Sequence, residues 1–115
     1  MRAGELFLVD FGPSTRGVEQ ANVRPAIVVH SAGYLRIPGL ALVCPITRAK
    51  RDVPNHVPIP PSAQTGLNEL SFVMTEQLRA VDRRFITTRL GSAPGQVIDT
   101  VLRTIRERHL AHGSS

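Results

Sequence analysis

Short apolar segments of strand length fill the chain from residue 6 to residue 90, and connections rich in Gly and Pro separate them. Only one segment, near the C-terminal end, repeats its apolar residues at the spacing of a helix. Apolar runs this short cannot supply the continuous stripes on which a helical bundle packs. The arrangement of the segments therefore predicts a mostly β fold that ends in one helix.

Six segments are expected to contribute strands. They are the apolar runs 6–9, 25–29 and 40–47, the partly alternating run 70–78, and the weaker segments 56–59 and 85–90. Pro45 interrupts the third run, and because proline lacks the N–H that a ladder uses, we expect a bulge or turn there. The connection 12–23 is long for a compact domain, and such connections often carry functional residues.

The C-terminal helix is expected to begin at Ser92, a favoured N-cap residue, with Pro94 in its first turn. One apolar face follows, made of Val97, Ile98, Val101, Leu102 and Ile105. Residues 111–115 are expected to fray at the end.

About five short antiparallel strands with a helix packed on them predict a small twisted sheet or barrel. The length of 115 residues predicts a single domain over 1–115.

The net charge of +5 points to an acidic partner, either a nucleic acid or an acidic protein. Thirteen of the fourteen cationic residues are Arg, whose planar fork suits phosphate, although codon bias in a GC-rich genome explains the same excess equally well. Cys44 is the only cysteine, which excludes an internal disulfide, argues against a zinc site and fits a reducing cytosol. No apolar run reaches the roughly 18 residues of a membrane span, so we expect a cytoplasmic protein without a membrane partner.

Short sequence blocks in a fixed order make the chain similar to one known family. The blocks are GELFLVD at 4–10, GVEQ at 17–20 followed by RPAIVV at 24–29, CPIT at 44–47, GL at 66–67, EQLR at 76–79 and LG at 90–91. Their order and spacing over nearly the whole chain resemble the MazF/PemK family of toxin endoribonucleases. The resemblance implies an SH3-like small barrel of about five antiparallel strands with a C-terminal helix, acting as a homodimer.

The same resemblance implies an activity and a partner. The family cleaves single-stranded RNA, such as mRNA, at short sequences without a metal or another cofactor. The products carry a 2′,3′-cyclic phosphate and a 5′-hydroxyl. A cognate antitoxin peptide blocks the enzyme by occupying the groove that binds RNA.

Three residues match the family's catalytic positions. Arg24 and Thr47 correspond to the two residues on which catalysis is thought to rest, and Glu19 corresponds to an acid in the first connection. One branch of the family is thought to use a His and an Arg-x-Asp instead. That version does not carry over intact, because the corresponding positions hold Val18, Met74 and Glu76.

Polar residues around these positions are candidates for RNA contact. Arg48, Lys50 and Arg51 form a basic cluster directly after Thr47, which suits phosphate. Gln20 and Gln77 are further candidates, since amide side chains read base edges. Stacking on aromatics is limited, because the chain has four Phe, one Tyr and no Trp.

The chemistry divides into three tasks. A base must take the proton of the 2′-hydroxyl, charge on the phosphorane must be stabilised, and the 5′-oxygen must leave protonated. Arg24 suits the second task, because its fork can hold two phosphate oxygens, and the hydroxyl of Thr47 can donate to another. Neither is a base at neutral pH, which leaves Glu19, a histidine or an Arg in an exceptional environment.

Each candidate also has an ordinary interpretation. Arg24 could be a surface charge or a structural ion pair, Thr47 could only end a strand, and Glu19 could be a solvated acid. His56, close to the basic cluster, is a further candidate for RNA contact. Two other functions remain open: a gyrase-poisoning toxin of the CcdB type, and a non-catalytic SH3-like binding module. The pairing of Arg24 with Thr47 favours the ribonuclease, because a gyrase-binding protein needs no phosphate clamp.

Overall fold

A computed structural model describes residues 1–13, 21–30 and 38–113 of the chain. Its elements in order are β1 (Glu5–Pro13), β2 (Ala21–His30), β3 (Leu40–Thr47), β4 (His56–Ile59), β5 (Ser71–Met74), the 3₁₀ helix η1 (Thr75–Gln77), β6 (Arg79–Asp82), the 3₁₀ helix η2 (Arg83–Phe85), β7 (Ile86–Ser92) and α2 (Gly95–Gly113). The predicted mostly β fold with one C-terminal helix is confirmed. The strands number seven rather than about five, because η1 divides the run 70–78 and β6 pairs separately.

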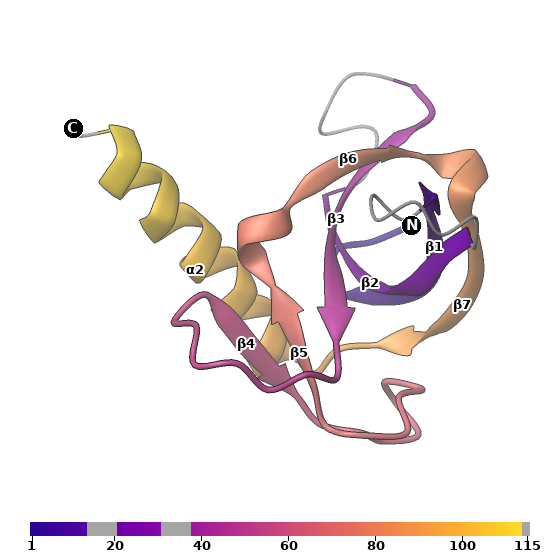
Figure 1. Cartoon of the computed structure of the whole chain (residues 1–115), viewed down its shortest axis with the longest axis horizontal. Helices are drawn as coiled ribbons and strands as arrows, with labels where there is room; N and C mark the ends of the chain where they lie inside the picture. The colour runs from indigo at the N-terminus through magenta and orange to yellow at the C-terminus, as the bar shows by residue number, and fades with distance from the viewer. Residues whose placement is uncertain (14–20, 31–37, 114–115) are drawn as a thin grey trace.

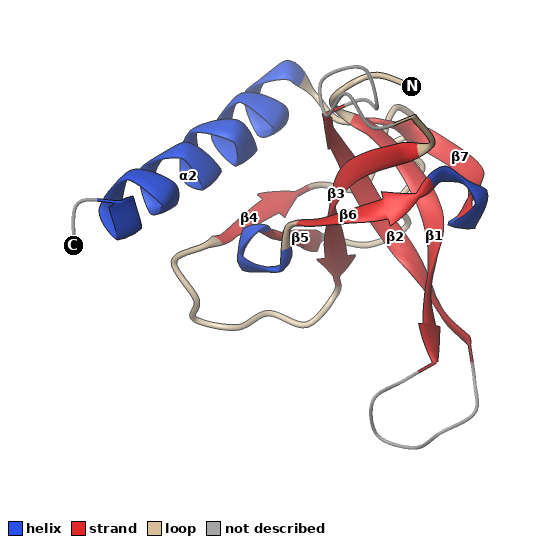
Figure 2. Cartoon of the chain, turned by 90° about the horizontal axis from the view of Figure 1, so that it is seen from above, coloured by secondary structure: helices blue, strands red, loops and turns tan. Residues whose placement is uncertain are grey.

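The strands form one antiparallel sheet in the order β4-β5-β3-β2-β1-β7, with β6 pairing to β3 beside β5. Figure 1 shows β6, β7, β1, β2 and β3 arranged as a ring, with β4 and β5 beside it next to α2. Within the described parts of the chain the end strands β4 and β7 do not pair, so the sheet curls like a barrel without closing. Figure 2 shows α2 along one side, with its C-terminal end leading away from the sheet.

Alternate residues of the central strands enter two separate cores. Leu6, Ile27 and Cys44 face the core that includes Val101 of α2. The other face, with Val28 among its buried residues, packs inside the ring. A strand buried on both faces reads as a continuous apolar run, which explains the sequence of 25–29. Among the described residues, no helix is long and apolar enough to cross a membrane.

Three local expectations were wrong. Ser92 does not cap the helix; it ends β7, where its N–H donates to the carbonyl of Gln64 at 2.8 Å, and α2 begins at Gly95. No bulge forms at Pro45, which lies where the second neighbour of β3 changes from β6 to β5, while the β2–β3 register shifts between Val28 and His30. The connection expected at 12–23 is shorter, because β1 continues to Pro13 and β2 begins at Ala21.

Two glycines allow the connection before β5 to dock on β7. A Cβ on Gly66, whose φ is +74°, would lie 2.1 Å from the carbonyl oxygen of Leu90. A Cβ on Gly91 would lie 2.1 Å from the carbonyl oxygen of Gln64. The buried hydroxyl of Thr65 ties the same connection together, because it accepts from the N–H of Leu67 at 3.2 Å and donates within the turn. The backbone from 65 to 67 is therefore fixed against β7.

Replacing Gly91 with Ala should destabilise the protein by about 3 kcal/mol, because the new methyl group meets backbone atoms that cannot move aside. Gly95→Ala is the matched control: nothing lies within 4 Å of its Cβ position, and it sits at the start of α2. We expect that control to be neutral or to stabilise by up to about 1 kcal/mol. Urea unfolding midpoints measure both, and equal midpoints for the two variants would contradict the close approach.

Candidate active site

A cavity with a volume of about 600 Å³ lies in the described part of the chain. It lies between the beginning of β2, the end of β3 and the connection that docks on β7. Its polar lining is made of Asn22, Arg24, Thr47, Arg48, Asn68, Glu69 and Ser71. Apolar residues, among them Leu8, Ile46 and Leu67, complete the walls.

Arg24 and Thr47 reach this cavity from neighbouring strands. The antiparallel pairing of β2 with β3 ends at Ala26 opposite Pro45, and Arg24 and Thr47 each lie two residues beyond that pair on their own strands. Residues two apart on a strand point to the same face, so Arg24 and Thr47 lie on the face of the sheet that Ala26 and Pro45 share. Both side chains are half-buried, and both line the cavity. The structure therefore brings together the two residues that the resemblance singles out.

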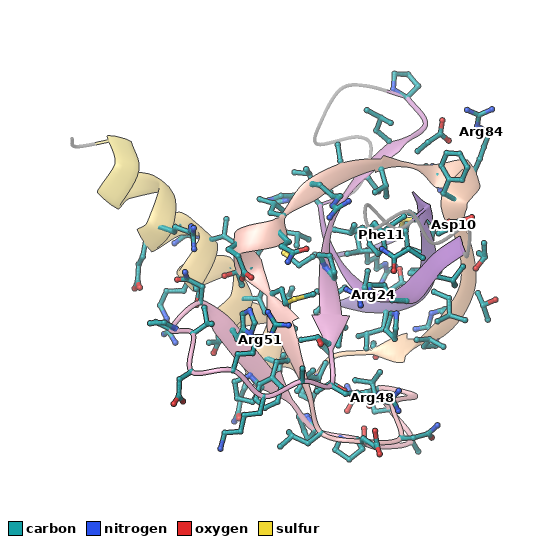
Figure 3. All side chains as sticks on the ribbon, viewed as in Figure 1. Asp10, Phe11, Arg24, Arg48, Arg51 and Arg84 are labelled. Atoms are coloured by element: carbon teal, nitrogen blue, oxygen red, sulfur yellow. The ribbon has the colours of Figure 1, made fainter. Side chains whose placement is uncertain are left out.

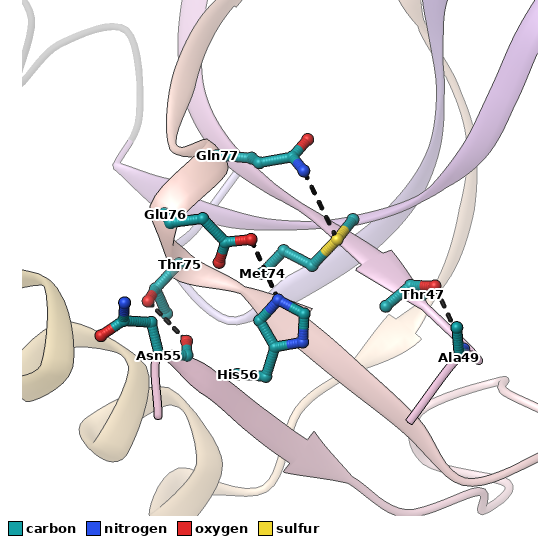
Figure 4. Close-up of polar contacts among 8 residues, drawn as sticks. All are labelled: Thr47, Ala49, Asn55, His56, Met74, Thr75, Glu76 and Gln77. Atoms are coloured by element: carbon teal, nitrogen blue, oxygen red, sulfur yellow. Dashed lines mark hydrogen bonds and ion pairs between the residues drawn. The ribbon is translucent and has the colours of Figure 1, made fainter. Parts of the chain in front are cut away.

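The hydroxyl of Thr47 is oriented by a local hydrogen bond. Its Oγ1 accepts from the backbone N–H of Ala49 at 3.1 Å, as Figure 4 shows. A hydroxyl that accepts in this way keeps its own O–H free to donate. The side chain can therefore donate a hydrogen bond to an oxygen atom bound in the cavity.

Arg48 and Glu69 form an ion pair at 2.9 Å between the end of β3 and the docked connection. Their side chains are 76% and 59% exposed, so the pair contributes at most about 1 kcal/mol to stability. A bound anion can compete with Glu69 for the guanidinium at little cost.

Among the basic residues predicted to contact RNA, Arg48 lines the cavity, whereas Lys50 and Arg51 are exposed outside it. Figure 3 shows Arg24 within the ring of strands and Arg48 nearer the docked connection.

Three polar residues of the cavity besides Glu69 were not predicted. Asn22 and Asn68 lie in segments without an apolar repeat, and Ser71 lies in the partly alternating run 70–78, where nothing in the alternation marks a polar residue as functional. One signal in the sequence could have identified Asn68: it directly follows the Gly-Leu block at 66–67, which is part of the family resemblance. Two predicted residues, Glu19 and Gln20, lie outside the described residues.

Gln77 is exposed on η1 rather than in the cavity. Its Nε2 lies 3.7 Å from Sδ of Met74, a weak contact that crosses the surface of β5. His56 does not present itself for RNA contact, because only 2% of its side chain is exposed and its Nε2 lies 3.0 Å from Oε2 of Glu76. His56 is therefore a packed residue, and its candidacy for RNA contact was wrong.

Cys44 is fully buried on β3, as a small apolar residue would be. Burial raises the pKa of its thiol to about 12, and the negative charge of Glu76 adds to the shift. The thiol is therefore protonated and inert at neutral pH. In the described part of the chain, no three His, Cys, Asp or Glu side chains gather in a group that could hold a metal ion.

A second cavity of about 320 Å³ lies between the end of β1 and β6. The Arg79 guanidinium lies 4.9 Å from the centre of the Phe11 ring, and Phe85 on η2 is 46% exposed at the edge of this cavity. Nearby, hydrogen bonds from Arg84 hold the pKa of Asp82 below its usual value. This end of the molecule combines exposed aromatic surface with paired charges.

A comparison with family models matches residues 2–108 to the PemK-like, MazF-like toxins of type II toxin–antitoxin systems. Endoribonuclease EndoA of Bacillus subtilis (strain 168) is 28% identical over 103 residues, which cover 88% of this chain and 87% of that protein. A crystal structure of MazE–MazF from Deinococcus radiodurans is similar with a TM-score of 0.74 and 30% identity, covering 91% of both chains. A mycobacterial endoribonuclease in complex with its cognate antitoxin shares the fold at a TM-score of 0.71, with 15% identity over 91% of this chain and 90% of that one.

The protonated state of Cys44 can be tested with a thiol reagent. A pKa of about 12 instead of 9.0 leaves about a thousandfold less thiolate at pH 8. We expect a disulfide reagent to label the native protein at least that much more slowly than the same protein unfolded in guanidinium. Equal labelling rates in the two states would contradict both the burial and the raised pKa.

Proposed function

The chain belongs to the PemK-like, MazF-like toxins of type II toxin–antitoxin systems, a family of RNA-cleaving endoribonucleases, and from this membership we propose that the cavity holding Arg24 and Thr47 cleaves single-stranded RNA. One observation carries the proposal. A guanidinium and a free hydroxyl donor, from adjacent strands, face the same 600 Å³ cavity. These are the two donors that a scissile phosphodiester requires.

The reaction begins with attack of the ribose 2′-oxygen on the adjacent phosphorus. The new bond joins the 2′-oxygen to phosphorus, and the bond between phosphorus and the 5′-oxygen breaks. The products are a 2′,3′-cyclic phosphate and a 5′-hydroxyl. No water is consumed in this step, so the site must position a phosphate and move two protons.

Arg24 holds the non-bridging phosphate oxygens through its planar fork. Negative charge on these oxygens grows in the phosphorane, so the contact strengthens as the reaction proceeds. Thr47 donates its hydroxyl to the same group, because its Oγ1 already accepts from Ala49 and the O–H is free. Both donors sit on strands, and their positions therefore change little when RNA binds.

Glu19, five residues before Arg24, removes the proton from the 2′-hydroxyl. Among the described residues that line the cavity, Glu69 is the single carboxylate, and it is already paired with Arg48. A carboxylate with an ordinary pKa is charged at neutral pH and able to accept a proton. Water delivers the proton that the leaving 5′-oxygen takes up, since the exposed Arg48 places the mouth of the cavity in solvent.

RNA on either side of the scissile phosphate is bound by polar residues outside the catalytic pair. Arg48, Lys50 and Arg51 contact phosphates, and Gln20 and Gln77 contact bases. Neither a metal ion nor another cofactor takes part, because the guanidinium supplies the positive charge. Cleavage should therefore continue in the presence of a chelator.

Two protein partners belong to this proposal. The first is a second copy of the chain, because Phe85 and the second cavity offer exposed apolar surface that a homodimer would cover. The second is a cognate antitoxin with an acidic segment that competes with RNA for the arginines at the cavity. The Deinococcus radiodurans relative was solved as a MazE–MazF complex.

The two other functions, a gyrase-poisoning toxin and a non-catalytic SH3-like module, do not account for the guanidinium and the hydroxyl that line one cavity. A toxin that poisons gyrase acts by binding protein and has no use for a guanidinium and a hydroxyl facing one cavity. A non-catalytic SH3-like module would bind RNA or peptide without cutting it. Incubation with total RNA and, separately, with gyrase distinguishes the three.

Arg24→Ala and Thr47→Val should each lower the rate of RNA cleavage by about 10²–10³-fold, because each removes a donor to the developing charge. The measurement is single-turnover cleavage of a single-stranded RNA, with and without a chelator. Thr47→Val keeps the shape and β-branching of the side chain, so circular dichroism should show an unchanged fold.

Arg103→Ala is the matched control for charge. Arg103 is an exposed arginine on α2, away from the cavity, and its loss should change the cleavage rate by less than about threefold. If Arg24→Ala cleaves at the rate of the unmodified protein, the assignment of the site is wrong. Loss of all cleavage in the chelator would contradict the metal-independent mechanism.

Titration with the cognate antitoxin should abolish cleavage once the complex is saturated, because the antitoxin and RNA share the arginines of the cavity. Raising the salt concentration should weaken both RNA binding and inhibition, as expected where charge pairs dominate. Arg48→Glu should weaken inhibition further by reversing one of these charges. Full cleavage in the saturated complex would show that the antitoxin binds elsewhere.

A further inference from the structure

The 3₁₀ helix η1 interrupts the strand pairing along β3, between β5 and β6. β6 pairs with β3 as far as Arg79 opposite Val43, and β5 takes over with Val73 opposite Ile46. β3 advances three residues between these two pairs, whereas the partner side advances six. The additional residues have no place in the ladder. They form η1, and other contacts must fix its position.

Two side-chain hydrogen bonds tie η1 to the beginning of β4. The Thr75 hydroxyl donates to the carbonyl of Asn55 at 2.6 Å, and Oε2 of Glu76 lies 3.0 Å from Nε2 of His56. Thr75 is buried, and the side chain of Glu76 is 25% exposed. One backbone bond closes the turn, from the N–H of Leu78 to the carbonyl of Thr75 at 3.3 Å.

The His56 imidazole is committed to this contact. Its side chain is 2% exposed, and to donate to a carboxylate its Nε2 must carry the proton. Its Nδ1 is buried without a hydrogen-bond partner, so the ring has one polar contact in the described structure, and that contact is Glu76. The charge of Glu76 also adds to the effect of burial in raising the pKa of Cys44.

The orientation of Glu76 determines that of Gln77. A 3₁₀ helix has three residues per turn, so its consecutive side chains point in three directions. Thr75 and Glu76 occupy the two directions towards β4, and Gln77 takes the third, where its amide lies over Sδ of Met74.

The surface that Gln77 covers is the one that carries Thr47. Thr47 pairs with Phe72, and Met74, two residues further along β5, points to the same face. Along β3 the distance from Cys44, beside η1, to Thr47 is about 10 Å at the rise of a strand. Figure 4 shows the sulfur of Met74 between Gln77 and Thr47, and a dashed line joins Glu76 to His56.

We propose that His56 and Glu76 form a positioning pair that holds η1 so that the amide of Gln77 reads an RNA base next to the phosphate bound at Thr47. The inference rests on the proposed RNA cleavage and adds a specificity element to it. His56 touches neither RNA nor the reacting atoms; it acts through Glu76 and the turn. Without the pair, η1 keeps its covalent ends on β5 and β6 but loses the contact that sets the direction of Gln77.

The test compares three single variants on a pool of single-stranded RNA with a randomised central segment, read by sequencing the 5′-hydroxyl ends. Gln77→Ala identifies the position whose base preference depends on the amide. His56→Leu should lower the preference at that same position by about tenfold, as expected for loss of a hydrogen-bonded base contact. His56→Gln, whose amide nitrogen can replace Nε2 as donor, should restore most of it.

A double variant separates positioning from general loss of stability. If His56 acts through Gln77, adding His56→Leu to Gln77→Ala changes the preference no further, because contacts in one network are not additive. Additive effects, or a His56→Leu variant with the preference of the unmodified protein, would overturn the inference. A preference lost at every position would mean that the substitution disturbs the whole sheet, and would also overturn it.

Hydrogen exchange provides a readout that does not require cleavage. The amide of Leu78 closes η1, so His56→Leu should speed its exchange at least tenfold relative to amides of α2. If the unmodified protein cleaves no RNA in the pool, the proposed function fails, and faster exchange at Leu78 still supports the positioning of η1. Unchanged exchange at Leu78 rejects the positioning pair in either case.

Discussion

The ladder between β2 and β3 determines where the proposed catalytic pair, Arg24 and Thr47, lies. Arg24 and Thr47 share a face only because Ala26 pairs with Pro45; a slip by one residue would turn one of them to the opposite face. The register is held from both sides, since alternate residues of the two strands are buried in two different cores. Packing that involves no catalytic group therefore sets the geometry of the proposed catalytic pair.

The rest of the cavity depends on a different constraint, the contact between the docked connection and β7. Gly66 and Gly91 permit this approach, and Thr65 holds the turn, so Glu69 comes within 2.9 Å of Arg48 and Asn68 lines the same cavity. A phosphate site needs donors that do not collapse onto each other when empty. In the proposed site, the weak, exposed pair between Arg48 and Glu69 would hold the guanidinium until a phosphate replaces the carboxylate.

The strands, and the two residues that meet at the cavity, could be predicted from the sequence for different reasons. Continuous apolar runs identify β2 and β3, because burial on both faces leaves no polar alternation. Arg24 and Thr47 were identified as candidates because they lie in short sequence blocks whose order resembles a known family, and composition alone would not have identified them. The polar wall at Asn68 could not be found, because it depends on where a connection docks. The division at η1 was missed because Thr75 and Glu76 sit in a run that alternates like a strand, and the reason they leave it is a hydrogen-bond partner on β4 that is distant in sequence.

The two parts of the proposed RNA site are therefore built differently, and this has a consequence for how such a site can change. Arg24 and Thr47 belong to the ladder, so replacing their neighbours alters a register on which two cores depend. Gln77 belongs to an excursion outside the ladder, held by side chains of β4 and η1. Residues in η1 can be exchanged without shifting a strand, provided that one contact like that of His56 with Glu76 survives. Under the two proposals, base preference can vary while the phosphate contacts stay fixed, because the contact that orients Gln77 lies between β4 and η1 and not in the ladder between β2 and β3.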